Sequence, residues 1–165
     1  MTAVPSKRQL IIARVALIAL IALIVLGLIL NGVSQDVFSR GFHHILQRSG
    51  GPMSFRFILQ PTMAALAALH DGARDARTQQ QPYVWTMLTH PVRSGPRLRE
   101  GLIATARIML LGLVMDAIYQ ITVLHAFYPG EMAAIALLLA FIPYLLLRGP
   151  MGRLAHWWSE HKTPR

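Results

Sequence analysis

Four runs of apolar residues dominate this chain. They cover residues 10–30, 53–70, 102–128 and 132–148. A bilayer is crossed by a helix of about 20 mostly apolar residues. Because lipid offers no hydrogen bonds, a spanning segment must satisfy its backbone polar groups internally, as a helix does. The runs therefore predict an all-α integral membrane protein with four transmembrane helices.

The second run is the weakest of the four, since it contains Arg56, Gln60 and Pro61. It fits either a short span or a re-entrant helix. If all four runs cross and the N-terminus is cytoplasmic, the only Lys or Arg residues left outside are Arg40, Arg48 and Arg56. If the second run fails to cross, almost all basic residues lie outside, against the positive-inside bias. We therefore expect four crossings, with both termini in the cytoplasm.

The first run follows Lys7 and Arg8, an arrangement that secretory signal peptides share. Its uninterrupted part, residues 15–30, is long for a signal peptide, and no A-x-A cleavage site follows it. We therefore expect a retained membrane anchor. The loop at residues 71–101 and the tail at 149–165 are then cytoplasmic.

Composition supports a lipid environment and removes several functions. The chain is 54% hydrophobic and 14% charged, which leaves too little polar surface for an ordinary soluble domain. It has no cysteine, which excludes disulfides, iron-sulfur clusters and thiolate metal sites. The net charge of +9 comes mainly from residues between the apolar runs, so it indicates topology and we expect no nucleic-acid partner. The Ala, Leu and Arg usage resembles that of small multispan inner-membrane proteins of high-GC bacteria, which predicts the bacterial inner membrane.

Residues 34–48 form a predicted amphipathic helix on the outer face. Apolar residues recur at one-turn spacing, while His43 and His44 fall elsewhere; Ser34 can cap the start and Gly50 can end the helix. The apolar side can rest on the membrane surface or pack against the protein's own spans, and both alternatives stay open. Seven residues of this helix, the loop and the tail are expected at the membrane interface: Phe38, Phe42, His43, His44, Trp85, Trp157 and Trp158.

Asp116 is the most unusual residue, because it lies inside the third run near the expected bilayer midplane. A carboxylate facing lipid there costs at least ~2.5 kcal/mol, so we expect it to face the protein interior. Tyr119 and Gln120 share its helix face. Arg56 and Gln60, four residues apart on the second helix, offer a complementary face; we expect Gln60 level with Gln120 and Arg56 nearer the outside. These five residues are the predicted buried polar cluster.

The sequence contains few residue patterns that indicate a metal site or a catalytic site. His43 and His44 are adjacent, so their rings point about 100° apart on a helix, and no H-x-x-x-H pair exists. Asp71 and Asp75 superficially resemble a fragment of the aspartate-rich motifs of membrane phospholipid and prenyl transferases. Too few acids are present for that chemistry, and we expect neighbouring arginines to pair with them. Nucleophile elbows, nucleotide-binding glycine loops and carboxylate pairs at catalytic spacing are missing, so we expect no enzyme, no metal and no cofactor.

The sequence thus predicts a non-catalytic integral membrane protein, serving as an accessory subunit or assembly factor of a larger membrane complex. Its partners would be membrane lipids and either other membrane subunits or further copies of itself. The alternative is a small proton-coupled transporter or channel subunit in which Asp116 is the titrating group.

Overall fold

The computed structural model describes residues 5–32, 35–77 and 91–161. These residues form five continuous helices. The first three are α1 (Lys7–Asn31), α2 (Gln35–Gly50) and α3 (Arg56–Arg77). The fourth joins α5 (Pro91–Tyr119) to the π-helical turn η1 (Gln120–Leu124), and the fifth runs through α6 (Pro129–Ala136), the π-helical turn η2 (Leu137–Phe141) and α7 (Ile142–His161). The predicted all-helical fold is confirmed.

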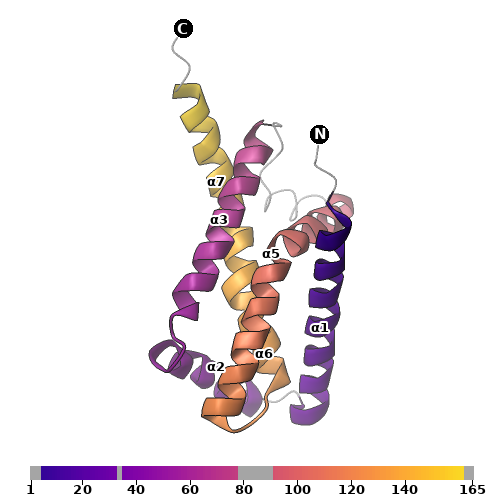
Figure 1. Cartoon of the computed structure of the whole chain (residues 1–165), viewed down its shortest axis with the longest axis vertical. Coiled ribbons are helices and arrows are strands. Elements are labelled where there is room, and N and C mark those ends of the chain that lie inside the picture. The colour runs from indigo at the N-terminus through magenta and orange to yellow at the C-terminus, as the bar shows by residue number, and fades with distance from the viewer. Residues whose placement is uncertain (1–4, 33–34, 78–90, 162–165) are drawn as a thin grey trace.

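Three of these helices are long and apolar enough to cross a membrane: Lys7–Asn31, Gly95–Leu124 and Pro129–Leu154. They correspond to the first, third and fourth apolar runs of the sequence. Helix α3, which contains the second run, does not reach the same hydropathy. It nevertheless runs alongside the others from one end of the molecule to the other (Figure 1).

The helices form an up-and-down bundle. Figure 1 shows α1 and α5 running in one direction and α3 and α7 in the other, so the two ends of the chain lie at the same end of the bundle. Helix α2 lies across the opposite end. The most extensive contact joins α3 to α7, while α1 packs against α5 and α6.

Several helices extend beyond the expected bounds. Helix α1 begins at Lys7 because Ser6 caps it: Ser6 Oγ accepts from Gln9 N, and Gln9 Oε1 accepts from Ser6 N. Helix α3 reaches Arg77 and α5 begins at Pro91, so much of the 71–101 segment that we expected to be a loop is helical. The tail is helical to His161, with Pro150 inside α7.

The connection between the third and fourth runs also differs from the expectation. The third helix ends at Leu124 and not at residue 128. The chain reverses over residues 125–128, where His125 has the left-handed backbone conformation, with φ of 48°. Pro129, which lies between the third and fourth apolar runs of the sequence, begins α6, where its missing N–H leaves no hydrogen bond unmade.

Small residues bring the helices close together. Five alanines are fully buried in the main core: Ala64, Ala68, Ala133, Ala136 and Ala140. Two glycine contacts are tighter still, because a Cβ on Gly72 would lie 2.7 Å from Arg148 O and one on Gly27 would lie 2.6 Å from Gly130 N. Close backbone approach of this kind is how helices associate within lipid.

Candidate functional site: a buried polar cluster

Asp116 lies at the centre of a polar cluster near the end of the bundle covered by α2. Its Oδ1 is 2.8 Å from Arg56 Nη1 on α3 and 3.7 Å from Arg48 Nη1 on α2. Its Oδ2 accepts a hydrogen bond of 2.8 Å from Gln120 Nε2. All four side chains are almost completely buried. One carboxylate therefore joins three helices in an environment where an unpaired charge would be very unfavourable.

Gln120 connects Asp116 to the reversal at residues 125–128. Its Nε2 also donates to Tyr128 O at 3.1 Å, and its Oε1 accepts from Tyr128 N at 2.7 Å. The side-chain amide thus supplies the acceptor for Tyr128 N, while Tyr128 O also accepts from Glu131 N and Met132 N at the start of α6. Gln120 is also the first residue of η1, and single π-helical turns are frequent at functional sites.

Tyr119 and Glu131 extend the cluster on either side of Arg48. The guanidinium carbons of Arg56 and Arg48 lie 4.9 Å and 5.4 Å from the centre of the Tyr119 ring. Arg48 Nη2 donates to Glu131 Oε2 at 3.1 Å, and His44 Nδ1 lies 3.0 Å from the same oxygen. Glu131 is on α6, so the cluster draws on four helical elements of the chain.

Helix α2 faces the bundle with its polar side. Arg40, His44 and Arg48 are spaced four apart and form one stripe. Their partners are Tyr128, Glu131 and Asp116. On other sides of α2, Phe42 and Leu46 are 56% and 55% exposed. These two residues therefore do not pack against the protein's own spans, which was one of the two alternatives predicted for the apolar side.

The register between α3 and α5 differs from the predicted one. Arg56, expected nearer the outside, is level with Asp116, and Gln60 packs against Gly112 instead of lying level with Gln120. The shift arises because a turn at residues 51–55, in which Met53 has φ of 64°, precedes α3 and places Gly51 beside Tyr119 Oη. Asp116 precedes the end of η1 by eight residues, about 12 Å along a helix. It is thus closer to the end of the bundle than the midplane position we expected.

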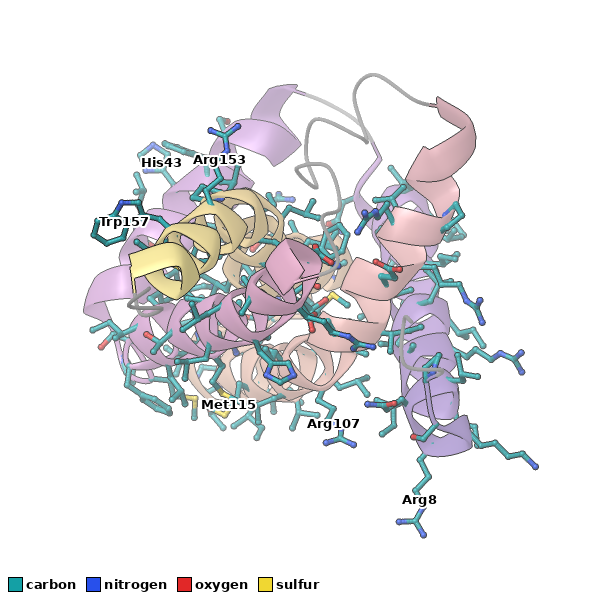
Figure 2. All side chains as sticks on the ribbon, turned by 90° about the horizontal axis from the view of Figure 1, so that it is seen from above. Arg8, His43, Arg107, Met115, Arg153 and Trp157 are labelled. Atoms are coloured by element: carbon teal, nitrogen blue, oxygen red, sulfur yellow. The ribbon has the colours of Figure 1, made fainter. Side chains whose placement is uncertain are left out.

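The predicted interfacial residues are described in part. The side chains of Phe38, Trp85 and Trp158 lie outside the described residues. His43 is exposed, as is Trp157, and Figure 2 shows both side chains pointing away from the bundle. His44, in contrast, turns inward to Glu131 and the Tyr128 ring, so it belongs to the polar cluster.

A second polar cluster lies at the opposite end of the bundle. Arg148 on α7 donates through Nε and Nη2 to Asp75 on α3, at 2.8 and 3.0 Å, and also to Glu100 Oε2 on α5 at 3.2 Å. Arg148 Nη1 donates to Tyr144 Oη, which donates to Asp71 Oδ2. A cavity of about 290 Å³ opens beside these residues. For Asp71 and Asp75 we expected neighbouring arginines as partners, and the structure adds Tyr144 and Arg148, which are distant in the sequence.

The chemistry of the two clusters is that of ion pairs between helices. Among the described residues, no group of three or more His, Asp or Glu side chains is arranged to hold a metal ion. No protein-family model, curated protein or solved structure matches the chain. The functional conclusion therefore depends on the geometry alone.

Proposed function

We propose that the protein is a non-catalytic integral protein of the bacterial inner membrane that crosses the bilayer four times, with both termini in the cytoplasm. The fourth crossing is α3, whose 22 residues extend about 33 Å, enough for a hydrocarbon core of about 30 Å. Its neighbours on both sides are apolar helices, and the two chain ends lie at the same end of the bundle (Figure 1). The distribution of Lys and Arg supports the same orientation.

Within the membrane we assign it the role of an accessory subunit or assembly factor of a larger complex. The observation that carries this proposal is the way Asp116 is held, between Arg56 and Arg48 and with no exposed surface. Its charge holds the chain's own helices together, as expected for a structural clasp. The apolar helix faces that remain are available to lipid and to other membrane subunits; on α1, Ile18 and Ile29 are among the most exposed residues.

Co-purification tests this proposal. The tagged protein is extracted in a mild detergent, and the proteins that accompany it are identified. We expect a stoichiometric membrane partner, and we expect Asp116→Asn to reduce that partner or the amount of protein. Glu100→Gln, a change at a half-exposed carboxylate in the other cluster, serves as the control. A protein that emerges alone and monomeric would contradict the proposal.

One observation favours the alternative of a proton-coupled transporter or channel subunit. Buried polar side chains continue beyond Asp116 to Gln60, which lies beside Gly112 in the bundle interior. In that case Asp116→Asn leaves partner binding intact and abolishes transport. The same variant thus separates the two functions.

A further inference from the structure

The polar cluster contains hydrogen-bonding groups that the described residues of the chain do not satisfy. Gln60 is 1% exposed, and neither its Nε2 nor its Oε1 has a hydrogen-bond partner within residues 5–32, 35–77 and 91–161. One turn away on the same face of α3, Arg56 makes its ion pair through Nη1, while its buried Nε and Nη2 have no hydrogen-bond partner in the part of the chain that the structure describes. Arg48 Nε is in the same position. Because buried polar groups in proteins are almost always hydrogen-bonded, these atoms indicate a site for a polar ligand.

The charges indicate a neutral ligand. The two guanidinium groups of Arg48 and Arg56 are balanced by the carboxylates of Asp116 and Glu131, which lie within ion-pair distance. An added anion would lie beside Asp116, and an added cation beside two arginines. Either one would bring an uncompensated charge into a buried place.

The hydrogen-bonding groups indicate a ligand that both donates and accepts. Arg56 and Gln60 Nε2 offer donors, whereas Gln60 Oε1 is an acceptor without a donor. A halide ion would leave this oxygen unsatisfied, and so would any other pure acceptor. Water meets both requirements, and buried water typically makes about three hydrogen bonds to groups of this kind.

We propose that water molecules lie between α2, α3 and α5, hydrogen-bonded to the unsatisfied groups of Arg56 and Gln60 and to Asp116. They bring solvent from the end of the bundle covered by α2 to the level of Gly112. This inference does not depend on the proposed accessory role. Its consequence is chemical: the carboxylate of Asp116, although enclosed by protein, is in contact with water through which protons can move.

Magnetisation transfer from water to glutamine side chains tests the proposal directly. The protein is labelled with ¹⁵N on its glutamine amides, reconstituted in lipid nanodiscs and studied by NMR. We expect rapid transfer from water to the Gln60 amide. Gln120 is the matched control, since it is equally buried but fully hydrogen-bonded to Asp116 and Tyr128. Exposed Gln47 is the positive control. Transfer to Gln60 no greater than transfer to Gln120 would overturn the proposal.

Thermal unfolding provides an independent test. If the Gln60 amide is hydrated, Gln60→Leu removes the hydrogen bonds between this side chain and water, and the Tm falls by several degrees. If the site is dry, the same change removes an unsatisfied amide and the Tm rises, which contradicts the proposal.

Exchanging chloride for gluconate tests whether an anion occupies the site. We expect the same Tm in both salts. If the Tm is higher in chloride, and this difference is absent in Arg56→Met, the site binds chloride instead of water.

Discussion

Asp116 and Arg56 illustrate at the scale of single residues why a buried ion pair is sensitive to the loss of one partner. Removing one member leaves the other charge buried and uncompensated, which typically costs about 3–5 kcal/mol. We therefore expect Asp116→Leu to lower the free energy of unfolding by about that amount. Arg56→Met should lower it by less, because Arg48 Nη1 remains 3.7 Å from Asp116 Oδ1. The double variant leaves neither charge of the 2.8 Å pair, so we expect it to recover a large part of the loss.

Reversible unfolding in mixed detergent measures this double-mutant cycle. Arg107→Met is the control, because Arg107 is also on α5 but is exposed and points away from the bundle (Figure 2). We expect its effect to stay within about 0.5 kcal/mol. Strictly additive losses at Asp116 and Arg56 would show that the two side chains do not interact.

The composition of the cluster was only partly accessible from the sequence. Asp116, Tyr119, Gln120 and Arg56 drew attention because polar residues inside apolar runs need an interior position, and the structure brings these four together. Arg48, His44 and Glu131 lie outside those runs, where charged residues are ordinarily exposed to water. The sequence did contain one indication of their position. Arg40, His44 and Arg48 follow one another at intervals of four residues, which places three basic or titratable side chains on one face of α2.

At the scale of elements, α2 differs from an ordinary surface helix. Its polar stripe faces protein, while Phe42 and Leu46 are exposed. For a chain in a membrane, the apolar side then faces lipid. The absence of cysteine allows single nitroxide labels at chosen positions. We expect a label at Phe42→Cys to be more accessible to oxygen, which dissolves in lipid, than to a water-soluble nickel chelate.

Gln47→Cys is the matched position for this measurement, since Gln47 is exposed on the same helix but about 140° around its axis from Phe42. We expect the reverse preference there. If the labels at both positions are more accessible to the nickel chelate than to oxygen, both exposed sides of α2 face water, which contradicts the expected contact with lipid.

The contact between α3 and α7 permits a test of helix packing. A Cβ on Gly72 would lie 2.7 Å from Arg148 O and 2.8 Å from Gly152 N, and both are backbone atoms. We expect Gly72→Ala to force the helices apart and to lower the free energy of unfolding by about 1–3 kcal/mol or more. Gly149→Ala on α7 is the control, because its Cβ would meet nothing within 4 Å. Alanine there favours the helix by up to about 1 kcal/mol. If Gly72→Ala and Gly149→Ala have similar effects in thermal unfolding, α3 and α7 are not in close backbone contact at Gly72.

The extent of the elements could be predicted better than their register. Apolar length located the helices, because it reflects the thickness of a bilayer. The depth of Gln60 could not be read in the same way, since the turn at residues 51–55 delays the start of α3 to Arg56. The π-helical turns η1 and η2 likewise shift the following residues around the helix. In η2 a cause is visible in the sequence: Pro143 has no N–H to donate to Leu139 O, so the ordinary hydrogen-bond pattern cannot continue through this region.

At the scale of the whole molecule, two polar clusters bracket an apolar core. One joins α2, α3, α5 and α6 through Asp116 and Glu131, and the other joins α3, α5 and α7 through Arg148. Between them, the buried core consists largely of Ala, Leu, Ile and Met. This order matches the polarity profile of a bilayer, with polar contacts toward both surfaces. It also fits the proposed crossing of α3 despite the modest hydropathy of this helix, since Arg56, Asp71 and Asp75 lie near its two ends and have partners there.

The number of crossings is the property that most depends on α3, and thiol labelling can determine it. Single cysteines are introduced at Arg8, at Gln47 and at Arg153, three exposed positions at the two ends of the bundle. Intact cells are treated with a reagent that cannot cross the inner membrane. If α3 crosses, Gln47→Cys reacts, while Arg8→Cys and Arg153→Cys react only after the membrane is opened. Arg8→Cys and Arg153→Cys each remove one positive charge, so their effects on orientation are comparable. If α3 does not cross, the last two transmembrane helices have the opposite orientation, and Arg153→Cys reacts in intact cells. That result would exclude four crossings and a cytoplasmic C-terminus.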